Sequence, residues 1–303
     1  MSTQLNLCNR CDLRKTLIYL HAYRFVTTKL TNGFIMNKNI IHTCILLAGL
    51  GAVSQSFAGA TCKDLPKAQE LKSTLLDVLA KKDYGGDGHP AWLTLVDASG
   101  VVCAIVTSIN NPSSDADVTT TMSGLGHRIL SAHKANTSNT YSHDHIALAS
   151  GNLYWLTLPG GAMYGTTLPA LSNTSSGNPD LWGTTKDPMV GKRVGGFTAL
   201  AGGLALFDSN KHKVGAIGVS GNPFCTAHTV AWKIREKLNN GAYTVANLPG
   251  GIANNFANDA LIEDVIPDNS GVGGPGRSAS GFGYPVCNFN PPNATDDGSI
   301  VGN

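Results

Sequence analysis

One pattern constrains the fold more than any other feature, because it occurs twice: two β-rich runs joined by a short polar turn. The first copy is "AWLTLVDASGVVCAIVTS", in which residues 91–96 and 101–108 flank Asp-Ala-Ser-Gly. The second is "GGLALFDSNKHKVGAIGVSG", residues 202–221. Apolar, β-branched runs around a turn-forming sequence are typical of β-hairpins. The sequence therefore predicts a small antiparallel sheet built from two hairpins.

Three segments between and around the hairpins have apolar residues at helical spacing. They are residues 64–82, residues 123–142 with Ser123 as a candidate N-cap, and residues 223–240. A period near 3.6 predicts amphipathic helices. The order helix, hairpin, helix, hairpin, helix predicts an α+β domain, an antiparallel sheet flanked by helices. Residues 154–197 are predicted to be long loops, and the Gly- and Pro-rich tail, residues 268–303, an irregular wrap held by Cys287.

The N-terminal region has the layout of a signal peptide. Residues 36–58 contain a lysine, an apolar block and the closing Ser-Phe-Ala, so we expect cleavage near Ala58. The apolar block has about 14 residues, whereas a membrane span needs about 20, so no stable span is expected. Residues 1–35 are interpreted as an N-terminal extension from a misassigned start, with Met36 as the start. Residues 59–303 then form a single domain, periplasmic or secreted.

Charge argues against a nucleic-acid partner. Residues 59–303 contain 16 Lys and Arg against 19 Asp and Glu, although the full chain has a formal net charge of +2. The basic balance belongs to the leader, and no basic run remains to bind nucleic acid or an anionic membrane.

Four cysteines remain after the expected cleavage: Cys62, Cys103, Cys225 and Cys287. An even number in an exported chain predicts two disulfides. Four cysteines allow three connectivities, and the sequence leaves all three open.

Residues 218–222, Gly-Val-Ser-Gly-Asn, nearly match the G-x-S-x-G turn of serine hydrolases. Asn222 replaces the last glycine, and the one histidine after Ser220 is His228, eight residues beyond that serine. This order does not suit an α/β-hydrolase. We therefore predict that Ser220 caps a strand-to-helix turn, and that the glycines, including Gly218, admit another backbone or a flat ligand.

Histidines are the other candidate site residues. His143 and His145 would share one face of an extended strand. Zinc needs three or four ligands, which this pair does not supply. Haem is less demanding, because one axial imidazole is enough in an apolar cleft. The candidate haem ligands are His127, His143, His145 and His228, with the last three as candidates for the iron itself. The candidates to meet the propionates are Arg128, Lys134, Lys192 and Arg193.

The second hairpin and the following "TAHTVAWKIREKL" resemble the GlcG/HbpS-like family of haem-binding or haem-degrading proteins, in an exported subgroup. "LVDASGVV" is similar to the hairpin of that family, and "SAHKANTSNTYS" is similar to its helix, with Lys134, Ala135 and Thr137 at matching positions. Residues 215–221 match its strand and turn. The resemblance implies a profilin-like α+β fold, assembly into a homo-oligomer, and haem as cofactor.

The leading hypothesis is an exported protein that binds haem for sequestration or sensing, with or without its slow oxidative degradation. A second hypothesis is an enzyme or binding protein for a small organic acid, with Lys134, Arg128 and Ser220 in its pocket. A third is a structural extracytoplasmic module. The sequence does not decide whether the protein is an enzyme.

Overall fold

The chain divides into two units, residues 1–57 and 58–303. The computed structural model describes residues 60–85, 89–110, 126–166, 177–253, 258–266, 276–287 and 298–302, all in the second unit. The predicted extension and signal peptide, and Ser123, lie outside these residues. Within them, no helix combines the length and the apolar character needed to cross a membrane.

The main sheet consists of the two predicted hairpins. Strands β1 (Trp92–Asp97) and β2 (Val102–Thr107) form the first, and β3 (Gly203–Phe207) and β4 (Lys213–Ser220) form the second. The strand order is β2-β1-β4-β3, and every neighbouring pair is antiparallel. The two hairpins therefore meet in the middle, where β1 pairs with β4.

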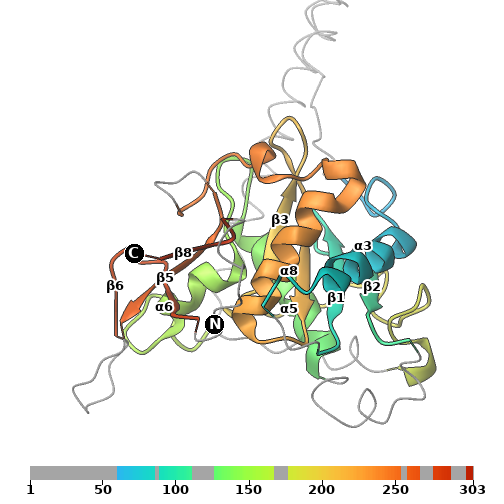
Figure 1. Ribbon diagram of the computed structural model, residues 1–303, viewed down its shortest axis with the longest axis horizontal. Helices are drawn as coiled ribbons and strands as arrows, with labels where there is room; N and C mark the ends of the chain where they lie inside the picture. Colours follow the sequence, from blue (N-terminus) through green and yellow to red (C-terminus); the bar gives the residue numbers. More distant parts are fainter. Residues whose placement is uncertain are drawn as a thin grey trace, which may run out of the picture. The chain divides into compact units, whose positions relative to one another are not determined.

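Three helices cover the sheet on both faces (Figure 1). Helices α3 (Ala68–Lys81) and α8 (Phe224–Lys237) pack on one face, where they share an apolar core with Leu93, Ile217 and Val219. Helix α5 (His127–Tyr141) packs on the other face. Strand side chains alternate between faces, so continuous apolar runs are expected in strands covered on both sides. The predicted α+β fold with helices flanking an antiparallel sheet is confirmed.

Glycines allow α5 to lie unusually close to the sheet. Gly203 and Gly218 are register partners on β3 and β4. A Cβ at Gly218 would overlap the carbonyl oxygen of Ser131, and one at Gly203 would overlap that of Lys134. Both contacts are with the backbone of α5, which cannot move aside as a side chain could. Backbone packing is therefore the role of Gly218, one of the two alternatives that the sequence left open.

A second, small sheet includes short pieces of the C-terminal tail, which is otherwise without helix or strand in its described residues. Strand β5 (Leu261–Ile266) pairs with three tail strands: β6 (Arg277–Ser278), β7 (Tyr284–Pro285) and β8 (Ile300–Gly302). The tail strands have two or three residues each, so they are too short to show a period of two in the sequence.

The middle region is loop-rich, as expected, in its described residues. Its regular elements are single turns of helix, α6 (Tyr154–Thr157) and η3 (Pro179–Leu181). Other short helices are η2 (Ser150–Leu153), η4 (Leu238–Gly241) and η5 (Val245–Asn247).

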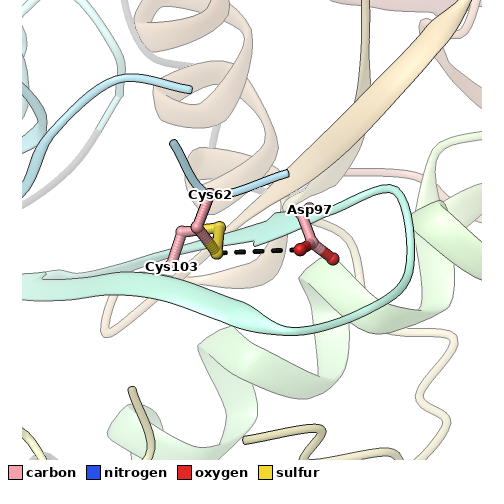
Figure 2. Close-up of side chains that lie close together, drawn as sticks. All are labelled: Cys62, Asp97 and Cys103. Carbon is pink, nitrogen blue, oxygen red and sulfur yellow. Dashed lines mark hydrogen bonds between the residues drawn. A yellow bond between two sulfur atoms is a disulfide. The ribbon is translucent and has the colours of Figure 1, made fainter. Parts of the chain in front are cut away.

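The four cysteines form two disulfides, Cys62–Cys103 and Cys225–Cys287. The first ties the segment before α3 to β2, next to Asp97 at the end of β1 (Figure 2). The second ties the first turn of α8 to the tail. The prediction of two disulfides is confirmed, and the connectivity that the sequence left open is now assigned.

Candidate functional site

The site lies where β4 ends and α5 and α8 begin. Ser220 is the last residue of β4, His127 is the first residue of α5, and Lys134 lies seven residues later on α5. Seven residues are close to two full helical turns, so His127 and Lys134 share a face of α5. We call Ser220, His127 and Lys134 the Ser220 cluster.

A tight turn after β4 fixes the position of Ser220. Gly221 has a φ of +118°, which disfavours residues with a side chain, and a Cβ there would overlap the carbonyl oxygen of Pro90. Helix α8 then begins with Pro223 at its N-cap, and no side chain caps this helix. The prediction that Ser220 caps the turn is therefore wrong, because its hydroxyl is directed elsewhere.

The Ser220 hydroxyl pairs with His127, 93 residues earlier in the chain. Its Oγ lies 2.8 Å from Nδ1 of the imidazole. Ser220 is buried, whereas His127 is half-buried. Desolvation lowers the pKa of His127, with further lowering by the charges of Lys134 and His89. The imidazole is therefore neutral at neutral pH.

Lys134 is fully buried. Its Nζ donates a hydrogen bond of 2.9 Å to the carbonyl oxygen of Val219 and lies 5.4 Å from the centre of the Phe224 ring. Burial lowers the pKa of this lysine to about 7. Within the described residues, no carboxylate forms an ion pair with this amine. At neutral pH a large share of the Lys134 amine is therefore uncharged and nucleophilic.

An apolar groove borders the cluster. It has a volume of about 500 Å³ and is lined by Phe224, Tyr154, Tyr284, Val286 and the Cys225–Cys287 disulfide, among others. Phe224 connects the groove with the Ser220 cluster, because its ring lines the groove and faces the Lys134 amine. This volume falls within the range of small-ligand pockets.

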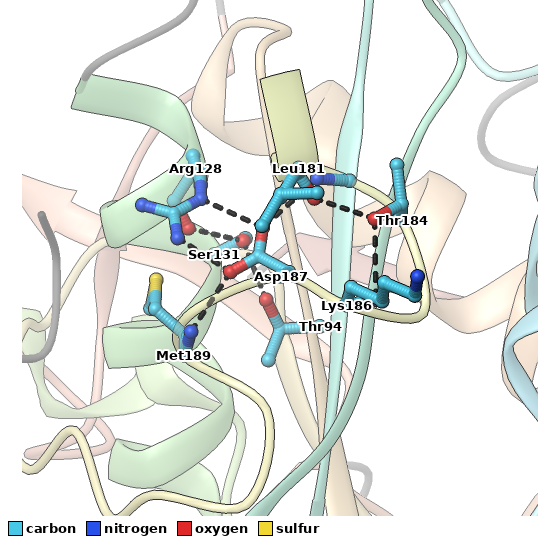
Figure 3. Close-up of polar contacts among 9 residues, drawn as sticks. Thr94, Arg128, Ser131, Leu181, Thr184, Lys186, Asp187 and Met189 are labelled. Carbon is cyan, nitrogen blue, oxygen red and sulfur yellow. Dashed lines mark hydrogen bonds and ion pairs between the residues drawn. The ribbon is translucent and has the colours of Figure 1, made fainter. Parts of the chain in front are cut away.

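Arg128 has a structural partner. Its guanidinium donates from Nε and Nη2 to the two carboxylate oxygens of Asp187 (Figure 3). It also stacks over Trp182, at 4.8 Å from the ring centre. Asp187 also accepts from the backbone N–H groups of Gly183 and Met189. Both charged groups are buried. The pair therefore joins the middle loop to α5. The predicted site residue Arg128 lies in this network and outside the Ser220 cluster.

Thr137 and Gly218 also have structural contacts. The Thr137 hydroxyl donates to the carbonyl oxygen of His133 and accepts from the backbone N–H of Thr198. Gly218 packs against α5, as described above. Neither residue offers a free polar group to a ligand within the described part of the chain.

The other three candidate histidines lie apart from the cluster. His143 and His145 are exposed in a turn after the C-terminal end of α5, with ring centres 5.8 Å apart. His127 begins this helix of 15 residues, so about 20 Å of helix separate the two ends. His228 is fully buried in α8, beside Trp232, across the sheet from α5. The structure therefore does not bring the three iron candidates, His143, His145 and His228, together.

Two groups of potential metal ligands exist among the described residues: Cys62, Asp97 and Cys103, and Cys225, Glu263 and Cys287. In each group the two sulfurs are joined in a disulfide, so neither is a thiolate ligand. The Asp97 carboxylate instead stabilises the hairpin turn, where it accepts from the backbone N–H groups of Ser99 and Val101.

Comparisons with known proteins leave the family open. No family model matches the chain, and no curated protein matches it. The crystal structure of the PduOC:haem complex is 18% identical with a TM-score of 0.37, over 59% of this chain and 99% of that chain. The Klebsiella pneumoniae protein ORFY is 16% identical with a TM-score of 0.32, over 55% of this chain and 83% of that chain. At these values neither likeness assigns a function.

Proposed function

We propose that this protein binds haem, with His127 as the axial ligand. The observation that carries the proposal is the hydrogen bond between His127 Nδ1 and Ser220 Oγ. Histidines that ligate a metal usually engage their second ring nitrogen in a hydrogen bond, which fixes the tautomer and the ring orientation. When Nδ1 donates to Ser220, Nε2 presents its lone pair to iron.

The donor set of the Ser220 cluster fits haem. Haem iron needs one protein imidazole, which must be neutral and within reach of solvent. His127 meets both conditions, because its pKa is lowered and it is half-buried. His228 is fully buried, and His143 and His145 are exposed in a turn beyond the C-terminal end of α5. His127 is therefore the first of the four candidates to test.

A haem titration of the purified protein tests the proposal. We expect saturable binding and a shifted Soret band in the wild type, and at least a tenfold weaker affinity in His127→Ala. His145→Ala is the matched control, since it removes an exposed imidazole of the same chain, and it should bind haem as the wild type does. A non-saturating titration of the wild type, or unchanged binding by His127→Ala, would overturn the assignment.

Export, and with it a role in haem sequestration or sensing, is part of the same proposal. It is supported by the signal-peptide layout of residues 36–58 and by two disulfides, which persist in oxidising compartments. Expression from Met36 in a bacterial host, followed by cell fractionation and an intact mass, tests it. We expect a periplasmic product shortened to near Ala58, and an uncleaved cytoplasmic product would contradict the proposal.

Assembly into a homo-oligomer and slow haem degradation extend this proposal and are supported by the family resemblance alone. Mass measurement by light scattering in the presence and absence of haem tests the first. Loss of the Soret band with an added reductant and oxygen, compared with free haem, tests the second.

A second candidate function is chemistry on a small organic acid. It is favoured by the burial of Lys134 next to Ser220, since a neutral lysine and a Ser–His hydrogen bond are typical of acid–base and nucleophilic sites. Arg128 does not contribute, because Asp187 occupies its guanidinium. Turnover of a small carboxylic acid by protein free of haem would favour this function over the first.

A further inference from the structure

The Lys134 amine is an unusual group to find in the interior. Lysine is almost never fully buried unless it is paired, and here its one hydrogen-bond partner in the described residues is the carbonyl oxygen of Val219. Gly202 packs closely against the amine, because a Cβ there would lie 2.6 Å from the carbonyl oxygen of Val219 and 3.2 Å from Nζ. The fold therefore packs tightly around an amine that has no ion-pair partner among the described residues.

A path to the amine leads through Phe224. Although the Lys134 side chain is fully buried, the Phe224 ring that covers it is 41% exposed and lines the apolar groove. Exposed aromatic side chains change rotamer on the picosecond to nanosecond scale. A rotation of Phe224 would connect the groove with Nζ. An apolar molecule in the groove would then lie next to the Lys134 Nζ atom.

We propose that Lys134 is a nucleophilic lysine that forms an imine with a small aldehyde or ketone whose apolar part lies in the groove beside Phe224. The nitrogen lone pair forms a bond to the carbonyl carbon and gives a carbinolamine. The former carbonyl oxygen then leaves as water, with both hydrogens supplied by the amine. The products are one imine and one water, so no oxidant or reductant takes part.

The protonation state of Lys134 supports this chemistry. Burial lowers the pKa of the amine to about 7, so most of it is neutral at pH 7.5. A solvated lysine has a pKa of about 10.4, so only about one part in a thousand is neutral at that pH. A desolvated lysine in an apolar environment is a known way to activate an amine for imine formation.

Reductive trapping with benzaldehyde tests the proposal on the whole chain without added haem. Benzaldehyde is the probe because its ring suits the apolar groove, and sodium cyanoborohydride reduces an imine to a stable secondary amine. Tryptic mapping by mass spectrometry then reports the labelling of each lysine at pH 7.5. We expect Lys134 to be labelled at least tenfold faster than Lys213, which is only half-buried and serves as the internal control.

Two variants test whether the labelling rate of Lys134 depends on the Phe224 side chain that covers it. Phe224→Ala uncovers the amine, so labelling of Lys134 should become several-fold faster. Leu76→Ala, which truncates an exposed apolar residue on α3, should leave the rate unchanged. Labelling spread evenly over the lysines, or an unlabelled Lys134 in both the wild type and Phe224→Ala, would overturn the proposal. Because the readout is a mass and no haem is present, the outcome is independent of the haem titration.

Discussion

Replacement of Lys134 by methionine should make the protein more stable and less sensitive to pH. Methionine has a similar length and no charge, so it fills the same space between α5 and β4 without the cost of burying an amine. It also loses the hydrogen bond from Nζ to the carbonyl oxygen of Val219. The variant therefore gains stability because no charge is buried, and it loses about 1 kcal/mol of stability because one hydrogen bond is missing.

The magnitude follows from the depressed pKa of the amine. Burial lowers it from 10.5 to about 7, which corresponds to about 5 kcal/mol of differential interaction. Between these two pH values the unfolded chain binds one more proton than the native protein, so stability rises with pH by up to about 1.4 kcal/mol per pH unit. Below pH 7 the Lys134 amine is protonated in the native and the unfolded state, and the native state is disfavoured by the full amount of about 5 kcal/mol. We expect Lys134→Met to gain about 2–4 kcal/mol at pH 6.

Urea unfolding at pH 6, 7, 8 and 9, followed by far-UV circular dichroism with the disulfides intact, measures this difference. The stability gain of Lys134→Met over the wild type should be largest at pH 6 and shrink as the pH rises. Lys213→Met is the matched control, because Lys213 is only half-buried and should give a much smaller change. A wild type whose pH slope equals that of Lys134→Met, or a variant that is less stable at pH 6, would refute the argument.

Two further predictions concern the contacts that hold α5 in place. Gly218→Ala should destabilise the protein by about 2–3 kcal/mol in urea unfolding, because its Cβ overlaps the backbone of α5; a loss below 0.5 kcal/mol would mean that α5 moves away at little cost. Arg128→Met should cost about 3–5 kcal/mol because it leaves the Asp187 carboxylate buried and unpaired, and Asp187→Asn in the same chain should restore part of this. A double variant as unstable as Arg128→Met alone would contradict the ion-pair argument.

The sequence predicted the parts of the fold that depend on local periodicity. Both hairpins and all three long helices occur where the apolar spacing placed them, within a few residues at each end. The strands of the main sheet have five to eight residues, which is long enough to show a pattern. The tail strands have two or three, and they form because β5 offers them backbone partners. That information is not local, so it was not visible in the tail sequence.

The site depends on contacts between residues far apart in the chain. His127 and Ser220 were both named as candidates, but their pairing across 93 residues follows from how α5 lies on β4. One local signal was available, since His127 and Lys134 are seven residues apart on a predicted helix and must share a face. The network of Arg128 had no such signal. Asp187 lies in a loop, and a loop without a period gives no indication of which charge it meets.

The glycines of the motif are required by the fold, whereas two side chains of the Ser220 cluster are not. Gly218 packs against α5, and Gly221 permits the turn next to Pro90, so both are needed by any chain that folds this way, whatever it binds. A resemblance based on these glycines is thus evidence for a fold. His127 and Lys134 are different, because the α5 packing needs no imidazole at the first residue of the helix and is weakened by a buried amine. Residues that lower the stability of a protein and contribute nothing to its fold are expected at functional sites. The function of this protein should therefore be sought first at these two side chains.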